Sequence, residues 1–307
     1  MGRGIVRKLG SRGLLKFLPD KLYLKLAYRS ELKSKLHLKT PKKYTEKLQW
    51  IKLYDRKEEY HSYVDKWLAR NVVSERIPDD ILIPIIGVFD SVESIPWDSL
   101  PDRFVIKCTH GSGSNIICRD KSSFDVASAK KQLKTWMKKE WFWLGREWPY
   151  VGLTPRIICE EYISEFDKSP DDYKIWCFNG KPLIINIHRD RFGDHRQDFY
   201  SLQGKQFAFN NIGYVNSDVK QIAITPSIQK CLEYARILSK NTFFSRIDFY
   251  IAQNRVYFGE ITFFDGAGFC DFVPDEVNYL LGNCLHLPID KETIDSMPEI
   301  EEKYIKD

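Results

Sequence analysis

The sequence predicts an α+β protein whose strands form the centre and whose first helices are basic. From residue 81 onward, short apolar runs alternate with turn signals, which is typical of strands. Other stretches repeat apolar residues at spacings of three and four, which indicates amphipathic helices. The first 43 residues hold thirteen Lys or Arg and two acidic residues, so the remainder carries a net charge of −6 within a total of +5.

The composition limits the class of protein. With 307 residues, 43% of them hydrophobic, the chain can bury a sizeable core and is not expected to be disordered. We find neither an uncharged apolar stretch of about 18 residues nor the pattern of a secretory signal. Seven cysteines without a Cys-x-x-Cys spacing predict a reducing, cytoplasmic location. A catalytic thiol is the less favoured interpretation, because no cysteine has a convincing histidine partner.

The basic segment 6–38 predicts two short amphipathic helices separated at Pro19 and Asp20. One interpretation is a packed arm with a solvated basic face. The other is peripheral contact with the inner face of a membrane or with a lipid-linked glycan. An acidic polymer would also suit such a face. Nucleic acid is not expected, because no recognition module follows.

The remaining elements follow from periodicity and turn residues. Asn179–Gly180 predicts a tight hairpin between two strands, and Gln253–Asn254 joins the last two strands. In chain order we expect helices over 44–75, strands from 81, a helix over 125–143, a strand over 155–163, a hairpin over 197–209, a helix over 226–240 and a closing helix near 274–285.

A first candidate site is a lysine at the end of an apolar strand, followed by a loop of glycines and hydroxyls. Backbone N–H groups and hydroxyls in such a loop can cradle phosphate oxygens, while the lysine supplies a point charge. The lysine precedes the glycines, so this is not a Walker motif. A plain hairpin turn is the alternative. The residues are Lys107, Thr109, Gly111, Ser112, Gly113 and Ser114.

A second candidate site comes from the last two strands. A tight turn between them is expected to bring Asp248 beside Glu260, with Arg246 and Thr262 on the same faces as these acids. Two carboxylates in apolar strands repel each other unless a cation lies between them, and oxygen ligands suit Mg²⁺. A surface ladder of ion pairs is the alternative.

A third candidate is the strand that ends in Glu160, Glu161, Tyr162 and Ile163, followed by Asp172 and Lys174 in the next strand. Such a segment can offer backbone groups to an adenine edge and a carboxylate to a ribose hydroxyl. An ordinary edge strand is the alternative.

The order of these blocks resembles the ATP-grasp superfamily over residues 60–285. The amino-acid sequences of the blocks are most similar to the TupA-like branch, which is linked to bacterial surface polysaccharides. The blocks are VDKWLAR, LPDRFVIKCTHGSGSNIIC, EEYI, DDYKIWCFNGKP, SRIDFY and FGEITFFDGAGF.

The resemblance implies a fold in which nucleotide lies between two β-layers, with ATP and Mg²⁺ as cofactors. It implies roles for phosphate-binding lysines (Lys66, Lys107), a lid loop (Thr109 to Asn115), an adenine hinge (Glu160 to Ile163), a ribose acid (Asp172), metal ligands (Asp248, Glu260) and an arginine beside the transferred phosphate (Arg246). Many relatives have Glu-x-Asn where this chain has Thr262, so Thr262 would be a weak ligand and Asp265 a substitute. Lys174 is a further candidate phosphate contact.

The resemblance also suggests how the chain is divided. We expect a basic helical extension (1–60), the start of the catalytic core (61–100), a small lobe with phosphate loop and hinge (101–163), a large lobe with the metal site (164–290) and a tail (291–307).

The expected activity is ligation of a carboxylate to an amine through an acyl-phosphate, on a bacterial surface polysaccharide or its precursor. A basic cluster after one strand is a candidate site for an acidic sugar such as a uronic acid, with a solvated charge run as the alternative. Its members are His188, Arg189, Arg191 and Arg196. The competing functions are a glycosyltransferase, for which Asp-x-Asp strings are absent, and a nucleotide-binding module without catalysis.

Overall fold

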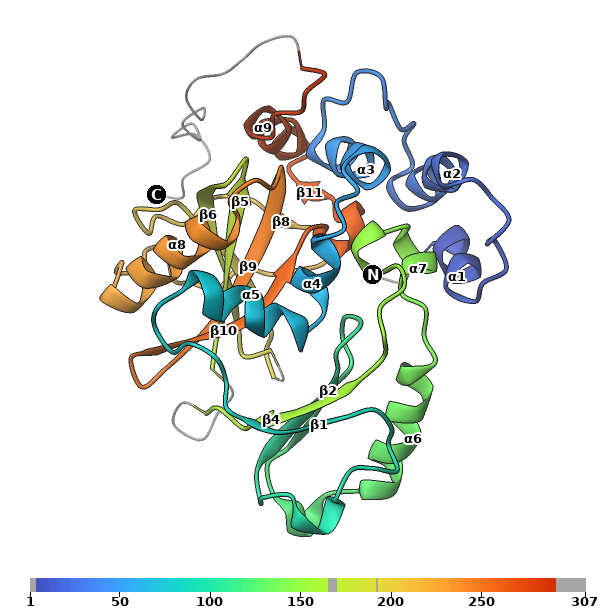
Figure 1. The fold of residues 1–307 in the computed structure, drawn as a ribbon. Coiled ribbons are helices and arrows are strands. Elements are labelled where there is room, and N and C mark those ends of the chain that lie inside the picture. The colour runs from blue at the N-terminus through green and yellow to red at the C-terminus, as the bar shows by residue number, and fades with distance from the viewer. Residues whose placement is uncertain (1–3, 165–169, 192, 291–307) are drawn as a thin grey trace.

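The structure is a computed structural model that describes residues 4–164, 170–191 and 193–290. The predicted tail, 291–307, lies outside the described residues. Two antiparallel sheets make up the centre, the smaller below the larger in Figure 1, and helices cover their outer faces.

The smaller sheet belongs to a lobe that packs against one helix, α6 (Val126–Met137). Along β2, Phe104, Ile106 and Cys108 are buried in the core of this lobe, whereas Val105 and Lys107 point to the opposite face, as strand alternation requires. The sheet order is β1 (Ile85–Phe89), β4 (Ile157–Glu161), β2 (Phe104–Cys108) and β3 (Asn115–Cys118).

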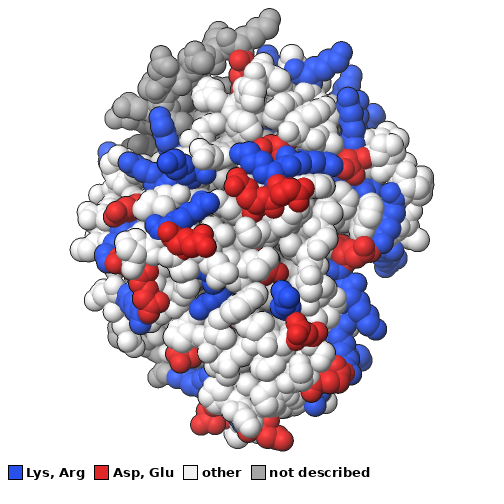
Figure 2. Space-filling view, viewed as in Figure 1, with Lys and Arg blue, Asp and Glu red and all other residues white. Residues whose placement is uncertain are grey.

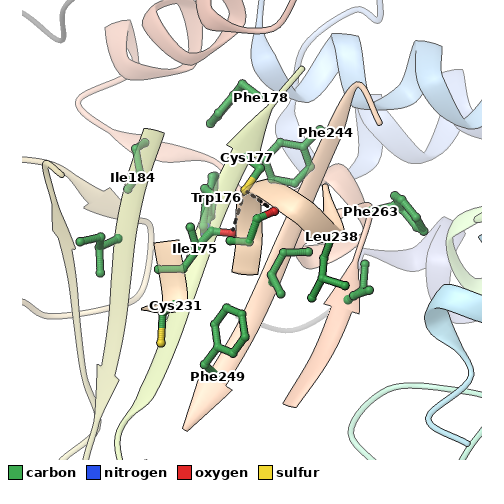
Figure 3. Close-up of a cluster of buried hydrophobic side chains, with 14 of the residues drawn as sticks. Ile175, Trp176, Cys177, Phe178, Ile184, Cys231, Leu238, Phe244, Phe249 and Phe263 are labelled. Carbon is green, nitrogen blue, oxygen red and sulfur yellow. Dashed lines mark hydrogen bonds between the residues drawn. The ribbon is translucent and has the colours of Figure 1, made fainter. Parts of the chain in front are cut away.

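The larger sheet packs one face on α8 (Pro226–Leu238). Figure 3 shows Cys231 and Leu238 of this helix close to Ile175 and Phe249 of the strands, and all four are fully buried. The other face of the sheet carries the polar residues of the candidate site. The sheet order is β10 (Arg255–Thr262), β9 (Phe244–Ala252), β5 (Asp172–Phe178), β6 (Lys181–Arg189) and β7 (Arg196–Tyr200).

Helices at both ends of the chain pack around the larger lobe (Figure 1). Among the described residues, no helix is long and apolar enough to span a bilayer. The helices are α1 (Ile5–Ser11), α2 (Asp20–Leu32), α3 (Tyr44–Tyr54), α4 (Tyr60–Val64), α5 (Leu68–Arg76), α7 (Phe142–Gly145) and α9 (Glu276–Cys284), with 3₁₀ turns η1 (Trp97–Ser99), η2 (Lys121–Ser123), η3 (Trp148–Tyr150) and η4 (Asp265–Gly268) and a ribbon of β8 (Asn210–Asn211) and β11 (Phe272–Val273).

Two tight turns set the register of the larger sheet. Asn179 and Gly180 have φ values of 47° and 77° and connect β5 to β6, as the sequence predicts. Gln253 and Asn254 connect β9 to β10 with φ values of 52° and 61°, so this turn reaches the left-handed region without glycine.

A β-bulge near Gly259 decides which face Glu260 occupies. Phe258 pairs with Phe249, and Glu260 pairs with Asp248, so the register shifts by one residue between them. Directly opposed residues point to the same face, so the bulge turns Glu260 away from the core side of Phe258 and toward Asp248.

The predicted segment 61–100 contributes to both lobes. Its helices α4 and α5 pack near the larger sheet, whereas β1 pairs with β4 in the smaller sheet. The boundaries at residues 60 and 100 therefore stay a prediction of how the sequence is divided. They do not separate one lobe from the other.

Candidate active site

The site centres on Arg246, which joins the carboxylates of β9 and β10. Its Nε and Nη2 donate to the two oxygens of Asp248 at 2.7 and 2.8 Å. Nη2 also donates to Glu260 Oε1 at 3.1 Å and to Thr262 Oγ1 at 3.3 Å. Nη1 donates to Asp265, in η4. The acids predicted to meet therefore do meet, around one guanidinium.

The charge on Glu260 is strongly stabilised. Burial alone would raise its pKa, but the cations of Lys66, Arg246, Lys174 and Arg191 outweigh burial and lower the pKa to about 2. The carboxylate is therefore ionised throughout the neutral range, which a metal ligand requires.

The donor set fits magnesium, because its atoms are oxygens from carboxylates and one hydroxyl. Among the described residues no group of three or more His, Cys, Asp or Glu side chains forms a metal cage. Mg²⁺ commonly binds through one or two carboxylates and shares its other positions with phosphates and water. Asp248 and Glu260 would hold the ion, and Thr262 already donates its hydroxyl to Glu260 Oε1 at 3.3 Å.

Three lysines from different elements reach the site, two of them beside Asp248 and Glu260. Lys174 of β5 donates to Asp248 Oδ2 at 2.6 Å. Lys66, between α4 and α5, lies 3.6 Å from Glu260 Oε2 and donates to Gly111 O at 2.6 Å. Lys107 of β2 donates to Glu160 Oε2 at 2.6 Å. A cavity of about 240 Å³ brings Lys66, Lys107, Lys174, Arg246, Asp248 and Glu260 together.

Some residues of the loop after Lys107 line the cavity, and others are buried in the protein interior. Ser112 and Gly113 line the cavity. Thr109 and Ser114 are fully buried, and Ser114 Oγ donates to Cys108 O at 3.4 Å. Phosphate contact through the Ser112 hydroxyl and the loop backbone is therefore geometrically open, whereas the hydroxyls of Thr109 and Ser114 point into the protein.

Gly111 fixes how the loop sits against the protein. A Cβ at this position would lie 1.9 Å from the Trp141 indole nitrogen, so no side chain fits. Gly113 has open space but a φ of 70°, which disfavours a Cβ for a different reason.

We expect Gly111→Ala to raise the KM for ATP about tenfold or more, because either the loop or Trp141 must move. Steady-state ATP turnover checks this. Gly152→Ala is the control, since a Cβ at Gly152 meets nothing within 4 Å, so any effect there reflects its φ of 68° and not a collision. Unchanged KM in the Gly111 variant would contradict the close packing.

A second cavity of about 460 Å³ adjoins the first and contains the predicted hinge. The two cavities share Lys107, Gly113, Asn115, Arg191 and Tyr250. The hinge residues Glu160, Glu161, Tyr162 and Ile163 line the second cavity together with Asp172 and apolar Ile83, Val105 and Ile117. Ile83, Val105 and Ile117 offer an apolar surface that suits a flat base, while the charged residues of the same cavity suit the polar parts of a nucleotide.

Two of these acids are held in place by cations. Glu160 accepts from Lys107 and from Arg70 Nη1, the latter at 3.4 Å. Asp172 accepts from Arg191 Nη1 at 3.0 Å and lies 3.5 Å from Lys174 Nζ. The second cavity is thus linked to the lysine-rich first cavity by ion pairs.

The first cavity is also lined by neutral polar groups. His188 Nδ1 lies 2.9 Å from His195 Nε2, and His188 Nε2 lies 3.0 Å from Asn186 Oδ1. Burial, followed by the nearby cations Lys174 and Arg246, holds the pKa of His188 well below its usual range. Burial also lowers the pKa of His195. Both rings are therefore neutral near pH 7.

His188→Gln should flatten the acid side of the stability curve. A histidine whose folded pKa lies below its unfolded pKa of about 6.5 contributes full stability above pH 6.5 and loses it below. Between pH 6.5 and 5, urea unfolding should show wild-type stability falling more steeply than that of the variant, by up to about 1.4 kcal/mol per pH unit. Parallel curves would contradict the low pKa.

The basic cluster predicted for substrate binding is separated by the fold. His188 and Arg191 line the first cavity. Arg189 donates to the fully buried Asp198, and its guanidinium lies over the ring of Tyr200. Arg196 pairs with Asp194 at 2.6 Å, away from both cavities.

Some lining residues were not singled out from the sequence. The first cavity also contains Cys270, Gln197, Asn211 and Tyr214, and Tyr250 lies at the junction of the two cavities. Tyr250 shares a strand face with Asp248, which alternation could have indicated. Burial raises the pKa of the Cys270 thiol to about 12, so it is not a ready nucleophile.

Comparison of the chain with known proteins identifies its family. A model described as TupA-like ATPgrasp matches residues 46–286. No curated protein matches the chain.

Three solved structures resemble the chain at low identity. They are the D-alanine–D-alanine ligase of Bacillus anthracis complexed with ATP (13% identity over 71% of this chain and 55% of that chain, TM-score 0.39), an L-amino acid ligase of Bacillus licheniformis (9%, 82% and 57%, 0.43), and the ATP-grasp ligase PsnB complexed with minimal precursor, Mg and ADP (9%, 82% and 62%, 0.38). The chain thus spans between 55% and 62% of the length of these structures.

The match to the family model covers most of the chain and confirms the resemblance seen in the sequence. The protein belongs to the TupA-like ATP-grasp family, and its paired β-layers are the ATP-grasp fold.

Proposed function

We propose that the chain is an ATP-dependent ligase that joins a carboxylate to an amine, with ATP and Mg²⁺ as its cofactors. The observation that carries the proposal is the pairing of Asp248 with Glu260 on adjacent strands. Lys66 and Lys107 reach the same cavity from outside the larger sheet. Anionic phosphates suit the lysines, and a divalent cation suits the acids.

In the proposed reaction an oxygen of the substrate carboxylate attacks the γ-phosphorus of ATP. The bond to the β,γ-bridging oxygen breaks, and ADP leaves. The amine nitrogen then attacks the acyl carbon, the bond to the phosphate oxygen breaks, inorganic phosphate leaves and the nitrogen loses a proton to solvent. Lys66, Lys107 and Arg246 would offset the charge that develops on the transferred oxygens, and bound Mg²⁺ would add to this stabilisation.

For the carboxylate we propose an acidic sugar of a bacterial surface polysaccharide or its precursor. Neutral donors and acceptors that line the first cavity suit a hydroxyl-rich molecule, and Arg191 suits its carboxylate. All seven cysteines are free, which supports a cytoplasmic location. A lipid-linked precursor would place the reaction at the inner face of the membrane.

The test is incubation with ATP, Mg²⁺, uronic-acid oligosaccharides and amino acids. We expect ADP and phosphate to form only when both substrates are present. Hydroxylamine added in place of the amine should trap the acyl-phosphate as a hydroxamate. Release of UDP or GDP from sugar nucleotides without ATP consumption would instead establish a glycosyltransferase. ATP binding without turnover on any pair would favour a non-catalytic module.

A further inference from the structure

Helix α2 has one face that is fixed to the large lobe. This face packs with Ala267 and Phe269, which belong to the segment that follows Asp265 of the active site. The inner face of α2 therefore lies over the wall of the first cavity. Its buried residues are Tyr23, Leu24, Ala27 and Tyr28.

The opposite face of α2 combines leucines with cations. Leu22 and Leu26, one turn apart, are 45% and 43% exposed. Lys21, Lys25 and Arg29 are exposed at the same helical spacing. Among the described residues these three cations have no ion-pair partner. On a face that contacts only water, exposed charges are expected, but two exposed leucines beside them contribute no stability.

The preceding turn continues the same pattern. Leu14 and Phe17 are 58% and 78% exposed, beside exposed Arg12, which has no ion-pair partner among the described residues, and beside exposed Lys16, which pairs with Glu140. Arg12 and Lys16 also border a surface hollow together with the end of α6 and with Lys138, Lys139 and Glu140, which follow that helix. Figure 2 shows Lys and Arg gathering along one margin of the molecule, over α1, α2 and α6.

The acidic residues of this segment do not offset the outward charge. Asp20 is held by Arg56 at 2.6 Å and Arg146 at 3.3 Å. Glu31 accepts from the backbone of Gly4 at 2.7 Å and lies 3.8 Å from Arg7. Both carboxylates are therefore neutralised on the inner side, and the outer face stays positive.

The segment is already ordered in the conformation that exposes this face. Arg146 Nη2 donates to Leu15 O at 2.7 Å and to Leu18 O at 3.3 Å. Tyr23 Oη donates to Leu144 O at 2.9 Å. Binding through the outer face would thus not require the helix to fold first, which removes a usual cost of interfacial helices.

We propose that the outer face of α2 and the turn before it bind the surface of an anionic phospholipid bilayer. The cations meet lipid phosphates while Phe17, Leu22 and Leu26 enter the boundary between headgroups and acyl chains. A soluble polyanion would contact the cations alone, and the apolar residues would remain exposed to water. The inner face of α2 then places the first cavity close to the bilayer. This inference does not depend on the chemistry proposed for the site.

The test is flotation of the full-length protein with vesicles of phosphatidylcholine and phosphatidylglycerol. We expect binding that increases with the phosphatidylglycerol fraction. Lys21→Gln with Lys25→Gln should weaken binding about 25-fold, since each cation near an anionic surface contributes about fivefold. Leu22→Ser with Leu26→Ser should weaken it at least tenfold at unchanged charge.

The control is Val215→Ser with Val219→Ser, which removes two exposed apolar residues (58% and 40%) from another surface and should bind as wild type. Circular dichroism of each variant shows whether the fold is kept. Vesicle binding that survives loss of the leucines, together with binding to polygalacturonate, would overturn the proposal in favour of a polyanion site. Absence of vesicle binding by the wild type would also overturn it.

Discussion

Glu260→Gln is expected to lower ATP turnover about a thousandfold, equivalent to about 4 kcal/mol of transition-state stabilisation, and to remove the Mg²⁺ dependence of nucleotide binding. Glutamine keeps the shape and one oxygen but loses the charge that Lys66 and Arg246 stabilise. Titration calorimetry with ADP, with and without Mg²⁺, measures the binding part directly.

Glu260 is a better target than its partner for this purpose. Asp248 is 3% exposed and balances both Arg246 and Lys174, so its loss would also destabilise the fold. The Glu260 side chain is 30% exposed. Glu233→Gln, at an exposed position on α8, is the matched control. High Mg²⁺ should partly restore the Glu260 variant if the residue binds metal, whereas a purely structural role would give no such recovery.

Arg246→Met should have the second large effect, with a loss of about 10²- to 10³-fold in kcat. The guanidinium contacts Asp248, Glu260 and Asp265, so its removal leaves three carboxylates together. We therefore also expect unfolding free energy to fall by about 3–5 kcal/mol at pH 7. The loss should shrink toward pH 5, because protonation of a carboxylate relieves the repulsion.

Arg246→Lys separates charge from geometry. Lysine keeps the positive charge but cannot reproduce the fork of donors, so stability should recover more than kcat does. Arg236→Met, at an exposed site on α8, controls for the loss of an arginine elsewhere. Urea unfolding and ATP turnover of the three variants provide the comparison. Wild-type turnover in Arg246→Met would contradict a role for this arginine both at the transferred phosphate and in positioning the acids.

The sequence predicted that Asp248 and Glu260 lie side by side, but the physical reason is more specific than a tight turn. With Gln253 and Asn254 as the turn and no bulge, regular pairing would oppose Asp248 to Gly259 and send Glu260 to the other face. The bulge shifts the pairing by one residue, so that Glu260 lies opposite Asp248. A glycine inside a strand often marks a bulge, so Gly259 could have indicated the bulge from the sequence.

Strand alternation also explains why the predicted basic cluster separates. His188 and Arg189 are neighbours in β6, so their side chains point to opposite faces. His188 faces the cavity and Arg189 turns to Asp198. Arg191 lies beyond the strand and returns to the cavity, which only the three-dimensional path of the chain reveals.

The loop after Lys107 shows how much of a site depends on packing and not on residue types alone. Five hydroxyl or glycine positions look equivalent in the sequence, yet Gly111 is pressed against Trp141, about thirty residues further along the chain. Contacts between such distant segments depend on packing and have no local signal. The ATP-grasp fold itself, by contrast, was identifiable because several blocks occur in a fixed order.

The most direct test of the account is a crystal structure with ADP and Mg²⁺. We predict one Mg²⁺ with oxygens of Asp248 and Glu260 about 2.1 Å away, phosphate oxygens within hydrogen-bonding distance of Lys66 and Lys107, and the base between the two sheets. Nucleotide bound elsewhere, or a metal that contacts neither carboxylate, would contradict the central claim.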